Sequence, residues 1–354
     1  MGYQVTIEPL GQAVEVEEGQ TILDACLRVG VWLPHACGHG LCATCKVAVL
    51  EGEFEHGPAS PFALMDVERS EGKALACCAT ALSDLVIEAD IDEEPDARHI
   101  PMRDYAGRVS RIVELTPTIR GIHIEVEGEG IEFQAGQYVQ VHVPGLEQPR
   151  AFSLANAPVD RHEVELNVRR VPNGSGTGWI HDQLKVGDPI RFTGPLGRFF
   201  VRQSDPQPLI FMAGGSGLSS PRSMILDLLN RGEPRTITLV YGARNRAELY
   251  YDDEFDKLAQ KHPSFSYVPV LSEPTAACTW GGETGFVHEA AHRRFGGDFR
   301  NHRAYLCGPP PMIEACIRTL MQGRLFERDI FTEKFLTSAD GAAALARSPL
   351  FRTI

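Results

Sequence analysis

Four cysteines in the first quarter of the chain place the strongest constraint on its fold. Three are spaced as Cys37-x4-Cys42-x2-Cys45, and a fourth, Cys77, follows at a distance. The intervening loop Gly38-His39-Gly40-Leu41 is rich in glycine, so its backbone N–H groups can point at sulfur atoms. Three thiolates on one loop and a fourth from afar form the plant-type ligand set of a 2Fe–2S cluster. The spacing therefore predicts such a cluster.

Two other metal sites compete for these cysteines, and both match less well. Structural zinc sites favour pairs of Cys-x2-Cys knuckles, and only Cys42 and Cys45 form one. A Rieske cluster needs two histidine ligands on one iron. Cys37-Gly38-His39 supplies half of that pattern, but no Cys-x2-His follows it. The spacing fits either Cys77 or Cys78 as the fourth ligand, and the preceding Leu-Ala pair favours Cys77.

The composition predicts a cytoplasmic protein of two or three domains. The chain has 354 residues and nine cysteines, an odd number without a signal-peptide pattern, which favours metal binding or burial over a disulfide scaffold. Hydrophobic residues make up 43% of the chain. No apolar run reaches the roughly 18 residues of a membrane-spanning helix, so we expect no membrane partner.

Negative charge is concentrated at one end of the chain. The net charge is -13; residues 1–95 hold 17 acidic side chains against 4 basic ones, and the remainder holds 30 of each sign. Nucleic acid is a poor partner for such a surface. An acidic face can steer association with a basic patch on a protein partner, or it can serve solubility alone.

Patterning along the chain predicts a multidomain α+β protein. Residues 1–93 read as short strands around a helix at 21–29, the order of a β-grasp fold. The acidic, proline-containing stretch 94–102 reads as a linker. Residues 103–203 carry short strands at regular spacing, which predicts a small antiparallel barrel of about six strands.

The last part of the chain, residues 204–354, alternates strands with helices and ends in a tail. The continuous apolar run 209–213 is expected of a parallel strand that is buried on both faces. A helix at 221–231 follows it, and the alternation continues to a helix at 310–322. This pattern predicts a doubly wound α/β domain.

Two segments of the predicted barrel have the chemistry of a flavin site. In Arg150-Ala151-Phe152-Ser153 the guanidinium can hold a diphosphate, the aromatic ring can cover the flavin, and Ser153 can bond flavin N5. The glycine-rich run 173–178, which includes Gly174 and Thr177, is predicted to be a flexible loop that cradles a pyrophosphate. A plain hairpin turn is the alternative.

Two segments of the α/β domain predict a nicotinamide site. Ala213-Gly214-Gly215-Ser216-Gly217-Leu218 follows the buried strand and precedes a helix, so its backbone can approach a pyrophosphate. Cys307 ends the last strand, where it packs beside the nicotinamide or is simply a small buried side chain. No acidic ribose residue is evident. Arg244 and Arg246 lie there instead, so the motif leaves NAD and NADP both open.

Taken together, these segments resemble the ferredoxin-type reductases of bacterial oxygenases, with the module order ferredoxin, flavin, nicotinamide. The resemblance covers essentially the whole chain and is greatest to the reductase components of multicomponent phenol hydroxylases. It rests on residues 31–40, 150–156, 213–221, 305–312 and 330–335.

The resemblance implies that the flavin is FAD and that the electron donor is NADH. Phe152 stands where the family often has tyrosine, which keeps the stacking and loses a hydroxyl. The matching positions are Cys37, Cys42, Cys45 and Cys77 for the cluster, Arg150, Phe152, Ser153 and Thr177 for the flavin, Gly215 and Gly217 for the nicotinamide phosphates, and Phe335 near the flavin.

We therefore expect electrons to pass from NADH through FAD and the cluster to a separate di-iron oxygenase that hydroxylates phenols, accompanied by a small regulatory protein. Ser153 and Cys307 are the expected catalytic positions, Gly174 and Arg244 are further cofactor contacts, and the protein is expected to be a monomer. Two alternatives stay open. One is a reductase of a Rieske aromatic-ring dioxygenase, and the other is a redox-sensing module that binds flavin without turnover.

Overall fold

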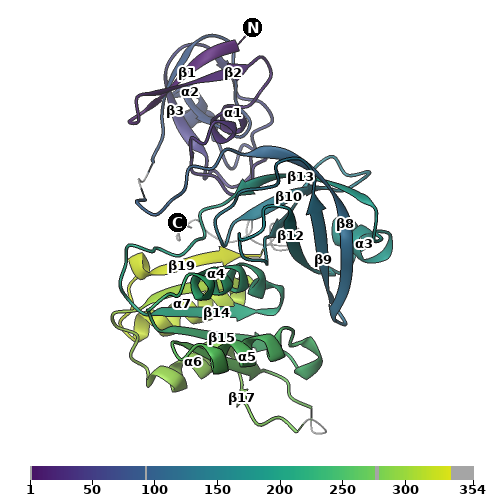
Figure 1. The fold of residues 1–354 in the computed structure, drawn as a ribbon. Helices are drawn as coiled ribbons and strands as arrows, with labels where there is room; N and C mark the ends of the chain where they lie inside the picture. Colours follow the sequence, from purple (N-terminus) through teal and green to yellow (C-terminus); the bar gives the residue numbers. More distant parts are fainter. Residues whose placement is uncertain (1, 92–93, 276–278, 336–354) are drawn as a thin grey trace. The chain divides into compact units, whose positions relative to one another are not determined.

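The computed structural model describes residues 2–91, 94–275 and 279–335 and divides the chain into two units (Figure 1). The first unit runs to Arg103 and the second begins at Asp104, so the flavin and nicotinamide parts share one unit. The predicted tail beyond residue 335 lies outside the described residues. No helix in the described ranges is long and apolar enough to cross a membrane.

The first unit is a five-stranded mixed sheet with the helix α1 packed on it, which confirms the β-grasp prediction. The strand order is β2-β1-β7-β3-β5, and only β1 and β7 run parallel. Thr21 caps α1 by accepting a hydrogen bond from the Asp24 N–H. The elements are β1 (Gly2–Glu8), β2 (Gln12–Glu17), α1 (Ile22–Arg28), β3 (Lys46–Glu51), β4 (Phe54–Glu55), α2 (Asp66–Ser70), β5 (Lys73–Leu75), β6 (Thr80–Ala81) and β7 (Leu85–Glu88).

The second unit opens with a six-stranded antiparallel barrel, as the strand spacing predicted. Its order is β11-β10-β13-β8-β9-β12, and a bridge between Leu154 and Leu166 joins the two end strands. Alternate side chains such as Val139 and Phe192 fill the interior. The elements are β8 (Arg103–Thr116), β9 (Ile119–Val126), β10 (Tyr138–His142), β11 (Arg150–Ser153), β12 (Glu163–Arg169), α3 (Ser175–Asp182) and β13 (Pro189–Leu196).

A six-stranded parallel sheet in the order β17-β16-β15-β14-β18-β19 follows the barrel. In β14, Leu209 and Phe211 join one core with α4 and α5, whereas Ile210 and Met212 join the opposite core with α6 and α7. That is why its apolar run is continuous. The strands and α-helices are β14 (Leu209–Gly214), α4 (Ser219–Asn230), β15 (Ile237–Ala243), α5 (Asp252–Lys261), β16 (Phe265–Leu271), β17 (Glu283–Thr284), α6 (Val287–Phe295), β18 (Arg303–Gly308), α7 (Pro310–Gln322) and β19 (Ile330–Lys334).

Two segments differ from their predicted form. The run 173–178 is neither a flexible loop nor a hairpin, because α3 begins within it at Ser175. Ile180 on this helix is buried in the barrel core, and that burial outweighs the poor helix propensity of the two glycines. Helix α4 begins at Ser219, two residues early, because the glycine-rich turn before it winds into the short 3-10 helix η1 (Gly215–Leu218).

The predicted linker 94–102 has no helix or strand, and its end is attached to the first unit. The backbone N–H of Met102 donates to the Leu27 carbonyl at the end of α1, and the Met102 side chain is buried. The chain then passes directly into β8, so the last part of this segment is held rather than free.

Candidate functional site

The cysteine loop wraps its backbone around sulfur atoms. The Gly40 N–H donates to Cys77 Sγ at 3.2 Å, and the Leu41 N–H donates to Cys37 Sγ at 3.3 Å. Gly40 has a φ of +79°, and a Cβ there would lie 2.7 Å from Cys78 Sγ. Only glycine lets the loop close this tightly, so the loop shape and the sulfur contacts depend on each other.

The structure brings the four predicted cluster ligands together. The Cys37 thiol contacts those of Cys42 and Cys77, and Cys45 also contacts Cys77. Cys78 Sγ lies 3.7 Å from Cys77 Sγ. A binuclear cluster needs only two thiolates per iron, so this donor set fits a 2Fe–2S cluster.

The predicted flavin residues lie on β11 and at the start of α3. The side chain of Arg150 crosses the first turn of α3, close to Gly176. A Cβ on Gly176 would lie 2.8 Å from Arg150 Cγ, so glycine leaves room for this crossing. The N-cap residue Gly174 offers no side-chain acceptor to the first N–H groups of the helix. A guanidinium beside such a helix N-terminus fits an anionic diphosphate.

The other flavin positions have protein contacts of their own. The hydroxyl of Thr177 accepts from the Val171 N–H at 3.1 Å and donates to the Gly174 carbonyl at 3.4 Å, so it shapes the turn before α3. Phe152 is partly buried against the barrel core. Ser153 is buried at the end of β11.

A carboxyl group that the sequence did not single out lies at the centre of the site. Glu333 Oε2 accepts hydrogen bonds from Ser220 Oγ at 2.6 Å, Ser153 Oγ at 3.2 Å and Cys307 Sγ at 3.4 Å. These donors come from α4, β11 and β18, so one carboxylate joins the barrel to the α/β fold. The only signal in the sequence was a charged residue within the segment 330–335, which the parallel pairing of β19 with β18 places here.

Burial is the largest influence on the pKa values of Glu333 and Cys307. It raises the pKa of Glu333, while the hydrogen bonds from Ser220, Cys307 and Ser153 act in the opposite direction. Burial, followed by the nearby Glu333 charge, raises the pKa of the Cys307 thiol well above its ordinary value. Cys307 is therefore a neutral thiol that donates a hydrogen bond, not a thiolate nucleophile.

The two predicted nicotinamide segments meet where the strand order reverses, between β14 and β18. A Cβ on Gly217 would lie 2.4 Å from the Cys307 carbonyl oxygen, so glycine allows the turn to pack against the end of β18. Gly215 adopts a φ of +56°. The Phe335 N–H donates to the Gly308 carbonyl at 3.0 Å, which brings the last described residue beside Cys307.

Arg244 is exposed after β15 and has an acidic partner. It forms an ion pair with Glu248 at 3.3 Å, within the 3-10 turn η2 (Arg246–Glu248). Glu248 also accepts a hydrogen bond from Thr118 of the barrel at 2.7 Å. Glu248 lies four positions beyond Arg244, and the turn between them brings the two side chains together.

Three family models match successive parts of the chain. The 2Fe-2S iron-sulfur cluster binding domain matches residues 5–82, the oxidoreductase FAD-binding domain matches residues 107–201, and the oxidoreductase NAD-binding domain matches residues 211–318. Their order is the one that the cysteine, flavin and nicotinamide motifs predicted.

Similar proteins match over the full length. The chain is 62% identical over 354 residues, all of both proteins, to the reductase component of phenol 2-monooxygenase from Pseudomonas sp. strain CF600. It is 56% identical, again over all of both chains, to the phenol hydroxylase P5 protein of Acinetobacter pittii. A crystal structure of the Amycolatopsis cytochrome P450 reductase matches with a TM-score of 0.84 and 36% identity, covering 94% of this chain and 98% of that one. The chain therefore belongs to the family of phenol hydroxylase reductase components, with their 2Fe–2S, FAD-binding and NAD-binding domains.

Proposed function

We propose that this protein passes electrons from NADH through FAD and the 2Fe–2S cluster to a separate di-iron oxygenase that hydroxylates phenols, which works with a small regulatory protein. The full-length identity to phenol hydroxylase reductase components carries this proposal. Bound FAD supplies the step from a two-electron hydride donor to a one-electron acceptor. We take the protein to be a cytoplasmic monomer, and the eight described cysteines, all free, suit a reducing compartment.

The proposed cluster ligands are Cys37, Cys42, Cys45 and Cys77. Backbone N–H groups of Gly40 and others in the loop stabilise charge on the ligand sulfurs, and such bonds tune the cluster potential. Cys42 is exposed, which gives an acceptor protein a short path to the cluster.

In the second unit, Arg150 and the N-terminus of α3 bind the flavin diphosphate, and Gly215 and Gly217 form the turn for the nicotinamide phosphates. Ser153 of the barrel and Cys307 of the α/β fold would contact the bound cofactors. Glu333 holds both of these side chains through one oxygen, so it orients them and keeps water from their polar atoms. Phe335 closes the site at the carboxyl end of β18.

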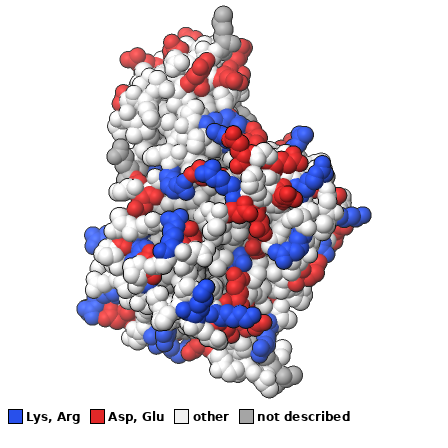
Figure 2. Space-filling model, in the orientation of Figure 1, with Lys and Arg blue, Asp and Glu red and all other residues white. Residues whose placement is uncertain are grey.

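The acceptor docks on the first unit beside the exposed cysteine. Leu41 is 53% exposed and Phe62 is 83% exposed, and their loops are tied by a hydrogen bond from the Ser60 N–H to the Gly40 carbonyl. Figure 2 shows acidic side chains on this unit, and its residues 1–95 hold the whole negative net charge of the chain. An oxygenase surface with an apolar centre and a basic rim is complementary to this combination.

Glu248 supports NADH rather than NADPH as the donor. Its carboxylate forms an ion pair with Arg244, the cation that would otherwise pair with a 2′-phosphate. Because a 2′-phosphate beside this carboxylate also meets like charge, the pair disfavours NADPH.

The decisive test of the function is NADH-dependent phenol hydroxylation. The protein is combined with a purified di-iron phenol hydroxylase and its regulatory protein, and in parallel with a Rieske dioxygenase. We expect turnover with the di-iron system. Turnover with the Rieske system alone would leave the cofactor chemistry in place and overturn the choice of partner, and no NADH oxidation with either would favour a sensing role.

Serine substitution separates the two candidates for the fourth ligand. Cys77→Ser removes a thiolate that the cluster requires, so we expect loss of the visible absorbance and of the electron paramagnetic resonance signal of the reduced cluster. Cys78→Ser, at an equally buried neighbour, is expected to retain both, with two irons per chain. The reverse pattern would make Cys78 the ligand.

Glu248→Gln keeps the shape of the turn and removes its negative charge. We expect the ratio of kcat/KM for NADH to that for NADPH to fall on the order of tenfold, because Arg244 becomes available to a 2′-phosphate. Glu132→Gln, in an exposed ion pair with Arg161 of the barrel, is the control and leaves the ratio unchanged. An unaltered ratio in Glu248→Gln would count against the proposed role.

Glu333 gives a pH-dependent contribution to stability. Its pKa is raised in the folded protein, so between about pH 4, where a free glutamate ionises, and the raised pKa the folded state holds a proton that the unfolded chain has lost. Stability from this group is present at low pH and is lost as the pH rises through the raised pKa. We expect the thermal midpoint of the wild-type protein to fall relative to that of Glu333→Gln across this window, and parallel curves would contradict the assignment.

A further inference from the structure

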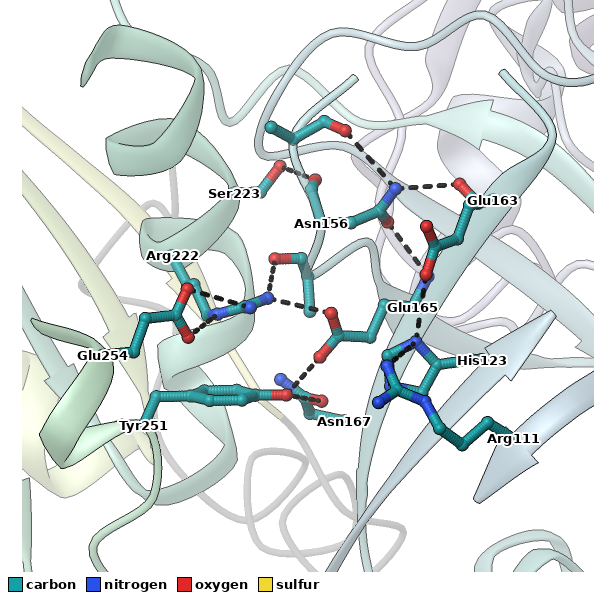
Figure 3. Close-up of polar contacts among 12 residues, drawn as sticks. Arg111, His123, Asn156, Glu163, Glu165, Asn167, Arg222, Ser223, Tyr251 and Glu254 are labelled. Atoms are coloured by element: carbon teal, nitrogen blue, oxygen red, sulfur yellow. Dashed lines mark hydrogen bonds and ion pairs between the residues drawn. The ribbon is translucent and has the colours of Figure 1, made fainter. Parts of the chain in front are cut away.

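We propose that Arg222 is a positioning residue that holds the flavin-binding segment of the barrel in register with the nicotinamide-binding turn. The inference rests on the proposed function, because it concerns the alignment of NADH with FAD. Arg222 lies on α4, which begins directly after the glycine-rich turn. Figure 3 shows its guanidinium between side chains of the barrel and of the α/β fold.

The guanidinium divides its donors between the two folds. Its Nε and Nη2 each donate to Glu254 of α5 at 3.1 Å, in a bidentate fork. On the other side, Nη1 donates to Glu165 of β12 at 2.9 Å and to the Ala155 carbonyl at 2.8 Å. Arginine is the side chain whose planar donors can serve such opposed acceptors at once.

The group is largely buried, and its one guanidinium faces two carboxylates. Arg222 is 8% exposed and Glu165 is 4% exposed. The Tyr251 ring lies 4.0 Å from the guanidinium carbon, and its hydroxyl donates to the second oxygen of Glu165. The backbone N–H of Glu165 donates to the side-chain oxygen of Asn156, which anchors this position of β12 (Figure 3).

The neighbours of Arg222 on α4 connect this group to the redox site. Ser220, two positions earlier, donates to Glu333, and Glu333 also accepts from Ser153. Ser223, one position later, donates to the Asn156 carbonyl at 2.6 Å. One turn of α4 is thus hydrogen-bonded to residues 155 and 156 directly and to Ser153 through Glu333. Ser153 is the proposed flavin contact. A shift of the guanidinium along this segment moves the nicotinamide turn relative to Ser153.

A purely structural role is the alternative. Replacing a buried ion pair by uncharged residues is often neutral for stability, so burial by itself does not explain why charges are used here. Arg303 offers a comparison within the same fold. It is also largely buried and pairs with Asp205 and Asp329, but it lies at the opposite end of β18 from Cys307. A structural role predicts the same behaviour for both arginines, and a positioning role separates them.

Three variants of the full chain, loaded with FAD, distinguish these roles. Arg222→Lys keeps the charge and loses the fork. Arg222→Met combined with Glu165→Gln and Glu254→Gln removes the whole charged group without leaving an unpaired buried charge. Arg303→Lys is the matched control. The readouts are the limiting rate of flavin reduction by NADH in anaerobic stopped flow, the FAD content, the thermal midpoint, and amide hydrogen exchange of residues 153–156.

We expect both Arg222 variants to retain FAD and a similar half-saturating NADH concentration, while the limiting rate falls on the order of 10- to 100-fold, because misalignment acts on the reacting geometry. Amide exchange at 153–156 is expected to be faster. Arg303→Lys is expected to lower the thermal midpoint and to leave the limiting rate within about twofold of wild type, since distant sites act independently.

Wild-type limiting rates in both Arg222 variants would overturn the inference. A fall in rate that only matches loss of FAD, or an equal fall in Arg303→Lys, would also overturn it in favour of a structural role. If NADH does not reduce the flavin of the wild-type protein, the proposed function itself fails, and the inference fails with it.

Discussion

Buried charge at the junction between the barrel and the α/β fold is the constraint on which the redox site depends. Glu333 is enclosed by three hydrogen-bond donors from three different elements, and Arg222 is enclosed by two carboxylates and a carbonyl. A buried polar or charged group that loses its partners costs free energy, so separation of the two folds would destabilise both groups. The packing at the junction is therefore specified by directional hydrogen bonds as well as by buried apolar surface. That directional control would suit a site that must align two bound cofactors.

The first unit solves a different problem by a different means. Its cysteine loop has almost no regular structure, and its shape is set by N–H groups that turn toward sulfur and by glycines that permit close approach. Gly40 shows both at once, because its N–H bonds Cys77 while its missing side chain leaves room for Cys78. A loop built this way can hold a cluster near the surface while the sheet behind it supplies rigidity.

The two units differ in where their charged side chains lie. Residues 1–95 of the first unit hold the net negative charge of the chain, whereas the remainder has balanced charge, and the second unit places ionic groups inside. Charge on a surface steers a partner over a distance, and charge in an interior fixes geometry over a few ångströms. In the proposed function, the first property serves the meeting with the oxygenase and the second serves the transfer between NADH and FAD.

Local patterns in the sequence determined much of this protein. The cysteine spacing predicted four thiols that the fold brings together, the apolar run at 209–213 predicted a strand buried on both faces, and the regular spacing of strands predicted the barrel. These features depend on residues that are close together in the chain or on a regular period, so the sequence alone reveals them. The helix α3 was missed because its stability comes from burial of Ile180 and not from the propensity of its glycines.

Only the tertiary structure decided which distant groups share the site. Glu248 and Arg222 lie in none of the segments that carry the resemblance, and Glu333 is only one charged residue within 330–335. Each of the three has partners far away in the sequence, such as Thr118, Ala155 and Ser153. A lone charged residue in a sequence is most often solvated on the surface. What makes these three different is the strand order and the packing of α4 against the barrel, which the sequence encodes only through the fold as a whole.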